Sequence, residues 1–375
     1  MRSKSVAVLD IRSSEVCVAV GERGVNNTFI VKTKYSCSFD GYADGELLDV
    51  KGFDSAVRQV IKNAMSASME NFSRFYVGIP GEFLKVKITD SEISFSSPQK
   101  IRDSHVYAVS EMAEPKDGNK GYSVIERSPV YYVLSDKRRV IDPIGSVTDS
   151  LKAKISWFLC KNSFAQCVIN AFKPFGQVRL KFIPAPLSQS CYLIDPRVRD
   201  SYAILVDLGY ISSNFSVAYG NGILFNQAFS VGIGHVAAFL MDELDVPFEV
   251  AVELMSCVNL NARDSLTSVQ EVSQGDIVYS FPVSALREII CEGLDGICEM
   301  IEECRRAFTA KDLSGKPIYM TGENVRTIRG TVEYISGRLG CTVEVVSPKV
   351  PYYDKPKFSS LFSLLDAALS DNENK

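Results

Sequence analysis

The stretch VAVLDIRSSEVCVAVGERG, from Val6 to Gly24, is matched about two hundred residues later by AILVDLGYISSNFSVAYGNG, from Ala203 to Gly222. In each copy an apolar strand ends in an aspartate, Asp10 or Asp207, and a turn with a Ser-Ser pair leads into a second, alternating strand. Two facing turns of this kind can bind nucleotide phosphates through backbone N–H groups and hydroxyls, and the aspartates can bind a hydrated divalent cation. A single such hairpin is common in any β-rich protein. Two copies in matching order favour a duplicated nucleotide-binding fold.

The composition is that of an ordinary soluble globular protein. A chain of 375 residues is too long for one compact core, so we expect two domains or two lobes with insertions. Apolar residues at 46% and charged residues at 23% argue against a disordered chain. The net charge of −4 argues against nucleic-acid binding, because such proteins usually carry a basic balance or a basic face.

The sequence predicts a cytoplasmic protein. Its first five residues run directly into a strand too short for a signal peptide, and no apolar run approaches the roughly 20 residues that span a bilayer. The ten cysteines are scattered without a CxxC pair, and several lie in strand or helix patterns, so we expect buried thiols in a reducing compartment. The two histidines, His105 and His235, have no cysteine at ligand spacing, which argues against a metal site of that type.

The first half of the chain alternates strands and helices around an inserted module. An amphipathic helix is predicted from Phe53, and RFYVGIPG, residues 74–81, is predicted to be a buried strand. Between Lys85 and Cys160 the pattern changes to strands, a helix that begins at Asp103, and the polar loop PKDGNKG. Two further strands, YSVIERSPVYYVL and SLKAKISWFL, flank a turn at residues 135–145. Its Lys-Arg-Arg cluster is predicted to be a solvated hairpin tip, with a partner-facing patch as the alternative.

The second half is richer in helices. Helical patterns cover residues 235–244, 248–258 and 283–308, and residues 316–346 have a pattern typical of strand, turn, helix and strand. The apolar positions of FSSLFSLLDAAL predict a final helix before a polar tail. That helix has no Lys or Arg on its polar face and carries Asp366, which indicates a core helix and not a membrane anchor.

These stretches resemble the superfamily of actin, heat-shock ATPases and sugar kinases. LDIRSSEV and VDLGYISSN resemble its two phosphate hairpins, and YMTGEN resembles the turn that holds adenosine. YVGIPG, RVIDPIG and IPAPLSQSCYL narrow the resemblance to the FtsA family, the bacterial actin homologues of cell division. The similarity runs in the same order from the first strand to Leu369.

The resemblance implies an α/β protein with a two-lobed actin-like (ribonuclease H-like) fold, built from duplicated mixed-sheet domains and a small inserted α+β subdomain in the first lobe. The implied first lobe comprises residues 1–84 with phosphate hairpin 1, the return segment 163–198, and the closing helix and polar tail at 351–375. The inserted subdomain is 85–162. The second lobe comprises 199–225 with phosphate hairpin 2, an upper, partner-docking part at 226–312, and 313–350 with the adenosine-type turn.

The resemblance also implies a cell-division scaffold that forms actin-like filaments and links the tubulin homologue FtsZ to other division proteins. FtsZ would dock on the second lobe at 226–312, and the inserted subdomain would contact the neighbouring subunit and other division proteins. The expected place is the division site, on the cytoplasmic side of the membrane. Because this chain stops after its closing helix, we expect it to reach the membrane only through a partner.

The ligands that the resemblance implies are ATP, bound between the lobes, and Mg²⁺, held through water by Asp10 and Asp207. The positions carried over as cofactor-binding are Asp10, Arg12, Ser13, Ser14, Asp207, Gly209, Ser212, Ser213, Gly232, Gly322, Glu323 and Asn324. No side chain is suited to be a catalytic base facing an acceptor.

Several departures from the family pattern fall in this site. Asn214 stands where the family has an acidic residue, and Met255 where it has a lysine. Positions at which the family has glycine are occupied by Arg12, Tyr210, Ile211, Ile233, Glu323 and Asn324. Glycines let peptide N–H groups reach a phosphate without a Cβ in the way, and the lysine would offset its charge. We therefore predict weak or absent ATP binding and no efficient hydrolysis. Arg12 has two interpretations: its guanidinium forks onto phosphate oxygens, or it fills the cleft.

Two other functions stay open at this point. One is an active ATPase or phosphotransferase of the same superfamily, for which a working cleft is required. The other is an actin-like adaptor of type IV pilus assembly, against which the DPIG turn argues mildly.

Overall fold

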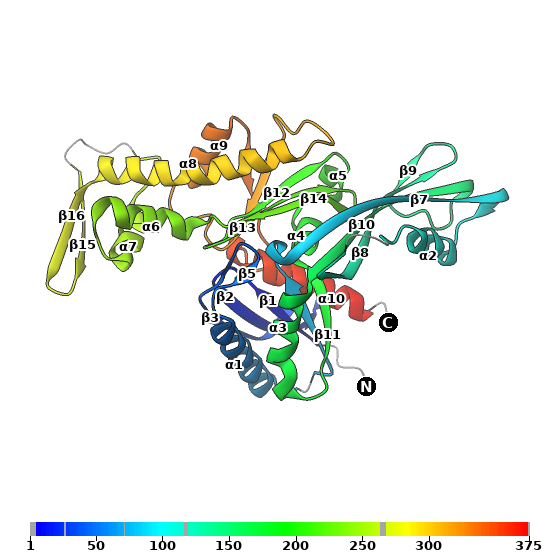
Figure 1. Cartoon of the computed structure of the whole chain (residues 1–375), viewed down its shortest axis with the longest axis horizontal. Helices are drawn as coiled ribbons and strands as arrows, with labels where there is room; N and C mark the ends of the chain where they lie inside the picture. The colour runs from blue at the N-terminus through cyan, green and yellow to red at the C-terminus, as the bar shows by residue number, and fades with distance from the viewer. Residues whose placement is uncertain (1–4, 26–27, 71, 116–118, 263–267, 374–375) are drawn as a thin grey trace.

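Two five-stranded mixed sheets with the same strand order form two lobes (Figure 1). The computed structural model describes residues 5–25, 28–70, 72–115, 119–262 and 268–373. In each sheet the first strand pairs antiparallel with the next and parallel with a later strand on its other side. The duplication and the two-lobed α/β fold predicted from the sequence are therefore confirmed.

The first lobe has the sheet order β11-β6-β1-β2-β3. Its strands and helices are β1 (Val6–Ile11), β2 (Glu15–Arg23), β3 (Phe29–Ser38), α1 (Val50–Ser68), β6 (Arg74–Ile79), α3 (Asn162–Phe172), β11 (Arg179–Pro184), α4 (Ala185–Leu193) and α10 (Ser359–Glu373). Strand β1 is buried along its whole length because both sheet faces are covered. One face packs on α1 and α3, and the other on α4 and α10.

The second lobe repeats this arrangement in the order β14-β13-β12-β17-β18. Its elements are β12 (Ala203–Asp207), β13 (Ser213–Tyr219), β14 (Gly222–Phe229), α6 (Ile233–Leu244), α7 (Phe248–Cys257), β15 (Val269–Gln274), β16 (Ile277–Pro282), α8 (Val283–Ala307), β17 (Ile318–Thr321), α9 (Thr331–Leu339) and β18 (Val343–Val345). Alternate residues of β12 face opposite ways: Ile204 and Val206 join the core under α6–α9, whereas Ala203 and Leu205 face the inserted subdomain.

Short elements complete the chain. They are β4 (Tyr42–Ala43), β5 (Glu46–Leu47), α5 (Pro196–Arg199) and the 3₁₀ turns η2 (Gly81–Phe83), η3 (Lys173–Phe175) and η4 (Pro356–Phe358). Sequence reasoning did not predict the β15–β16 hairpin. Residues 116–118 of the predicted polar loop lie outside the described residues.

The inserted subdomain is a four-stranded sheet with one helix, and it packs on the second lobe. Its elements are β7 (Leu84–Lys100), α2 (Asp103–Met112), β8 (Tyr122–Leu134), β9 (Arg139–Val140) and β10 (Val147–Lys161), in the sheet order β7-β10-β8-β9. Phe158 of β10 is fully buried against the second-lobe sheet, and Ser156 donates to the carbonyl of Ile223 at 2.8 Å. Gly220, in the β13–β14 turn, lies directly against β8 of the insert. A Cβ on Gly220 would be 1.9 Å from the carbonyl oxygen of Val130. Strand β8 of the insert also contacts β11 of the first lobe, so the insert contacts both lobes.

The basic turn of the insert is the solvated tip that the sequence predicts. Lys137, Arg138 and Arg139 are all exposed. Arg139 also donates to the hydroxyl of Tyr219 at 2.6 Å and lies over the ring of Tyr131, 5.0 Å from its centroid. The sequence did not indicate this contact, in which two tyrosines at the junction with the second lobe provide a partner and a flat surface for the guanidinium.

The final helix is a core helix, as predicted. Leu361, Phe362 and Leu365 are buried against the first-lobe sheet, and Asp366 pairs with Arg23 at 2.8 Å. Within the described ranges, no helix combines the length and apolar character needed to cross a membrane.

The ten cysteines are free thiols. Five are buried: Cys17, Cys160, Cys298, Cys304 and Cys341. The prediction of buried thiols is wrong for Cys191 and Cys257, which are exposed.

Gly78 in β6 gives a test of the packing of α10. A Cβ on Gly78 would lie 2.3 Å from Cδ1 of the fully buried Leu364, so Gly78→Ala requires the helix or that leucine to shift. We expect Gly78→Ala to lower the free energy of unfolding by about 1–3 kcal/mol, the usual cost of overpacking, in urea titrations followed by circular dichroism.

The matched control is Gly337→Ala in α9, where a new Cβ meets no described atom within 4 Å. This change is expected to leave stability unchanged or to raise it by up to about 1 kcal/mol, because Ala is the better helix former. Equal stability of Gly78→Ala and the parent chain would show that α10 is not closely packed on β6.

Candidate functional site

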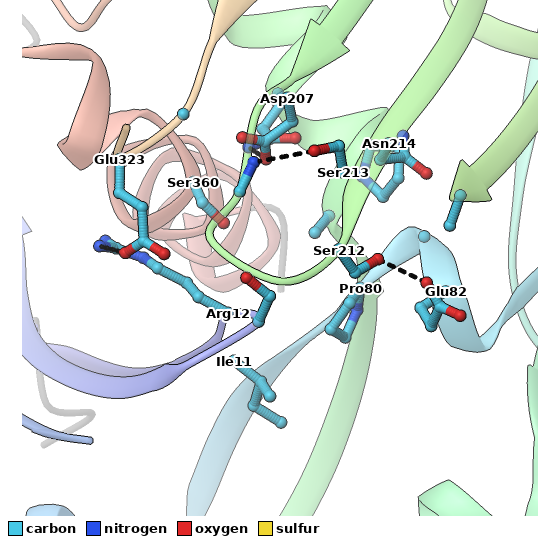
Figure 2. A pocket seen from close by; sticks show the side chains of 18 of the residues that line it. Ile11, Arg12, Pro80, Glu82, Asp207, Ser212, Ser213, Asn214, Glu323 and Ser360 are labelled. Carbon is cyan, nitrogen blue, oxygen red and sulfur yellow. Dashed lines mark hydrogen bonds and ion pairs between the residues drawn. The ribbon is translucent and has the colours of Figure 1, made fainter. Parts of the chain in front are cut away.

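The turns of the two hairpins meet between the lobes. The hydroxyl of Ser13, in the turn after β1, accepts hydrogen bonds from the backbone N–H groups of Tyr210 (3.0 Å) and Ile211 (3.1 Å), in the turn after β12. Figure 2 shows residues of both turns around one cavity. The two ribbons therefore face each other across a shared groove.

Most of the residues that the sequence analysis assigns to a cofactor are brought together here. Those that line the cavity are Arg12, Ser13, Asp207, Gly209, Ser212, Ser213, Gly322 and Glu323. The other four stand back from it. Asp10 is fully buried, and Ser14 is turned toward Glu323 at 3.5 Å. Gly232 begins α6, and Asn324 accepts a hydrogen bond from Thr327.

The two aspartates of the proposed cation site are bound by protein groups. Asp10 accepts hydrogen bonds from Arg12 Nε (2.9 Å) and Ser360 Oγ (2.6 Å). Asp207 accepts one from Gln189 Nε2 at 2.6 Å. Charge-assisted bonds of this length are strong, so a hydrated cation would have to compete with them.

Arg12 fills the cleft. Its guanidinium bonds Asp10 on one side. On the other side its Nη1 lies 3.6 Å from Glu323 Oε2, and Figure 2 shows Arg12 and Glu323 pointing toward one another. Burial alone would lower the pKa of Arg12, but the charges of Asp10 and Glu323 raise it above its usual value. The sequence leaves two interpretations of Arg12 open, a contact with phosphate oxygens or a place within the cleft. In the structure Arg12 lies within the cleft, bonded to protein carboxylates.

The carboxylates of Asp207 and Glu323 lie in an environment that disfavours their charged forms. Burial raises the pKa of Asp207, and the charge of Asp10 raises it further, against the opposing effects of Gln189 and Arg12. Burial also raises the pKa of Glu323, with Arg12 opposing. Acids in this setting repel a polyphosphate.

The N-terminal amides of α6 are also used within the protein. Ile233 N–H donates to the carbonyl of Gly209 at 3.1 Å, and Gly234 N–H donates to the carbonyl of Tyr210 at 2.9 Å. Such amides are the usual anion-binding groups at a helix N-terminus. Here they hold the second turn against the helix.

The bulky residues of the second turn have packing partners of their own. Ile211 lies against Gly41, where a Cβ would be 2.5 Å from its Cδ1, and the ring of Tyr210 lies against Gly234. Met255, at the position of the family's lysine, is fully buried in the core of the second lobe. No cation therefore faces the cleft from that position.

Sequence reasoning missed four residues of this site: Glu82, Gln189, Ser360 and Tyr42. Glu82 follows the YVGIPG strand and accepts hydrogen bonds from Ser212 Oγ (2.5 Å) and Gly45 N–H (2.6 Å). Burial, with a smaller contribution from the charge of Glu82, raises the pKa of Tyr42 well above its usual value. The stretches that hold Glu82, Gln189 and Ser360 were recognised, but only the fold shows which side chain of each reaches the cleft.

The cavity that remains is about 60 Å³. A water molecule takes about 30 Å³ of liquid volume, whereas small-molecule pockets are about 300–1,000 Å³. With its small volume, and with Ser13 and Arg12 both bonded to protein groups, this arrangement of residues does not fit a nucleotide.

Asp207→Asn tests the electrostatics of the cleft. Because the folded state raises the pKa of Asp207 above its ordinary value of 3.8, the native chain binds a proton more readily than the unfolded chain does. This carboxylate therefore makes the free energy of unfolding fall as pH rises from about 4 toward neutrality. Asn keeps an acceptor for Gln189 but removes the charge.

We expect the variant to flatten that dependence by at most about 1.4 kcal/mol per pH unit, measured by urea titration at several pH values. Asp276→Asn, a change at the exposed β15–β16 turn, is the control and should leave the slope unaltered. An identical slope for Asp207→Asn and the parent chain would contradict the raised pKa.

No protein-family profile matches the sequence. The curated cell division protein FtsA of Streptococcus pneumoniae is 21% identical over 366 residues, covering 96% of this chain and 79% of that protein. FtsA of Buchnera aphidicola is 19% identical over 360 residues, covering 91% of this chain and 85% of that protein.

Solved structures of low identity share the fold. The PilM-PilN type IV pilus biogenesis complex superposes with a TM-score of 0.64 at 12% identity, covering 98% of this chain and 99% of that chain. MreB5 of Spiroplasma citri bound to ADP gives a TM-score of 0.58 at 9% identity, covering 100% and 99%. The chain has a two-lobed actin-like fold, and its sequence is similar to FtsA over nearly its whole length.

Proposed function

We propose that this chain is an FtsA-like scaffold of bacterial cell division, which assembles with itself and links an FtsZ-type tubulin homologue to other division proteins. The observation that carries the proposal is the extent of the similarity: two FtsA proteins match 96% and 91% of this chain. The proposed place of action is the division site, on the cytoplasmic face of the membrane.

Self-assembly is supported by the structures that share the fold. One of these is the MamK double helical filament, with a TM-score of 0.53 at 13% identity over 98% of each chain. We propose that copies of this chain associate head to tail, since a contact between two different surfaces repeats without closing and so produces a filament.

The proposed docking site for FtsZ is the upper part of the second lobe, residues 226–312. Its β15–β16 hairpin projects from one end of the molecule in Figure 1. One face of the hairpin packs on the core through Val272, whereas Val269 and Val278, on the opposite face, are 54% and 60% exposed. Exposed valines beside polar groups are suited to a protein contact.

The proposed surface for other division proteins is the inserted subdomain, residues 85–162. Large apolar side chains are exposed on it at Tyr107 and Met112 of α2 and at Ile144 and Val147 near the DPIG turn. The insert lies at the opposite end of the molecule from the β15–β16 hairpin in Figure 1. Separate ends allow two partners to bind at once.

We propose that efficient ATP hydrolysis is not part of this function. MreB of Spiroplasma citri was solved with ADP and with AMPPNP, so nucleotide binding occurs within this fold. In this chain several of the glycines and the lysine expected at the site are replaced, and Arg12 bonds the aspartate that would hold Mg²⁺. An active ATPase or phosphotransferase is therefore the less favoured alternative.

A second candidate is an actin-like adaptor of type IV pilus assembly. The observation in its favour is the TM-score of 0.64 with the PilM-PilN complex, which is higher than the 0.58 with MreB5. The full-length similarity to FtsA in sequence favours cell division.

Pull-downs with purified full-length chain distinguish the two. We expect capture of FtsZ from the same organism and no capture of a PilN-type pilus protein, together with pelleting of the chain alone on ultracentrifugation. Capture of the pilus protein without FtsZ would replace the proposal by the adaptor function.

Val278→Asp tests the docking surface. Because position 278 is exposed, the change should alter stability by less than about 0.5 kcal/mol. If FtsZ covers this position, the aspartate is buried in the contact without a partner. We therefore expect the dissociation constant for FtsZ, measured by biolayer interferometry, to rise about tenfold or more.

The matched control is Val25→Asp, at an 82% exposed position between β2 and β3 of the first lobe. It should bind FtsZ like the parent chain. Equal losses in both variants, or in neither, would remove residues 226–312 as the docking site.

A further inference from the structure

The cleft is crossed by hydrogen bonds between the lobes, each made by a group that could otherwise face a ligand. Gln189 of α4 in the first lobe donates to Asp207 at the end of β12 in the second. Ser212 of the second lobe donates to Glu82 of the first. These bonds connect the same strand ends and turns that form the groove.

Ser13 makes the most specific of these contacts. Two successive N–H groups that converge on one oxygen form a nest, the backbone arrangement that binds anions. In this chain the oxygen between Tyr210 N and Ile211 N is the hydroxyl of Ser13, whose residue is only 3% exposed. A neutral side chain of the first lobe thus satisfies two donors of the second.

Glu82 makes a second interlobe contact, at the rim of the cleft. Its two carboxylate oxygens accept from Gly45 N–H in its own lobe and from Ser212 in the other. Two further interlobe bonds lie beside it: Asn226 Nδ2 donates to the carbonyl of Gly81 at 3.3 Å, and Asp44 N–H donates to Ser230 Oγ at 2.7 Å.

We infer that the lobes are held closed by an internal latch, in which Ser13 and Glu82 take up the hydrogen-bond donors of the second-lobe turn, and that closure needs no nucleotide. A nucleotide would have to break the bonds of Ser13 and displace Arg12 from between Asp10 and Glu323. Removing the guanidinium from two buried carboxylates is costly, because it leaves them without a counter-charge. This inference concerns the cleft alone and does not depend on which partner the chain binds.

Amide hydrogen exchange on the full-length chain tests the latch directly. In the absence of nucleotide, we expect the Tyr210 and Ile211 amides to be protected. Ser13→Ala should speed exchange at both about five- to tenfold, the change expected for losing one net hydrogen bond. Ser14→Ala is the matched control, because the neighbouring hydroxyl makes only a 3.5 Å contact with Glu323, and exchange should stay as in the parent chain.

A second arm adds 1 mM ATP with Mg²⁺ to the parent chain. We expect no added protection at Tyr210 and Ile211 and no shift of the melting temperature. Free exchange of these amides without nucleotide, with protection appearing on addition of MgATP, would overturn the latch.

If Ser13→Ala does not fold, Glu82→Gln provides the same test at the rim. Its neutral amide offers one acceptor in place of two, which weakens the bond from Ser212 of the second lobe. Exchange at the neighbouring Asp44 amide, which donates to Ser230 of the second lobe, should therefore increase while Tyr210 and Ile211 stay protected. Unchanged exchange at Asp44 would show that Glu82 does not hold the lobes.

Discussion

Two carboxylates at equivalent strand ends dominate the centre of the molecule. Asp10 is fully buried and Asp207 mostly so, and each needs a compensating donor because a buried charge without one is strongly destabilising. Arg12, Ser360 and Gln189 supply those donors. The groups that could compensate a nucleotide and its cation are therefore used by the protein itself.

The same compensation explains why several substitutions occur together in one site. An arginine at position 12 needs acceptors, and Asp10 and Glu323 provide them from the two lobes. The bulk of Tyr210 and Ile211 is accommodated by close contacts with Gly234 and Gly41. Arg12, Tyr210, Ile211 and Glu323 thus each have a contact that accommodates them, which is typical of a mutually adjusted site.

The elements of the fold were predictable from the sequence because their signals are local. The alternating and helical periods of β1, α1, β8 and α8 lie within each element. The duplication was visible because both hairpins kept their aspartate and their Ser-Ser turn. The β15–β16 hairpin was missed because the apolar residues of β15, Val269 and Val272, are three positions apart and do not follow the alternation that predicts a strand.

The contacts of the site were less predictable. Glu82, Gln189 and Ser360 are far apart in the sequence, and their roles depend on which face of an element points into the cleft. The choice between the two interpretations of Arg12 likewise depended on Glu323, more than three hundred residues away in the sequence. The partner of Arg139 was missed for the same reason, because Tyr219 belongs to the other lobe.

The position of the inserted subdomain has a mechanical consequence. It emerges from the first lobe yet rests on β14 of the second, where Gly220 leaves no room between the β13–β14 turn and Val130. Rotation of one lobe relative to the other must therefore drag this subdomain across a tightly fitted surface.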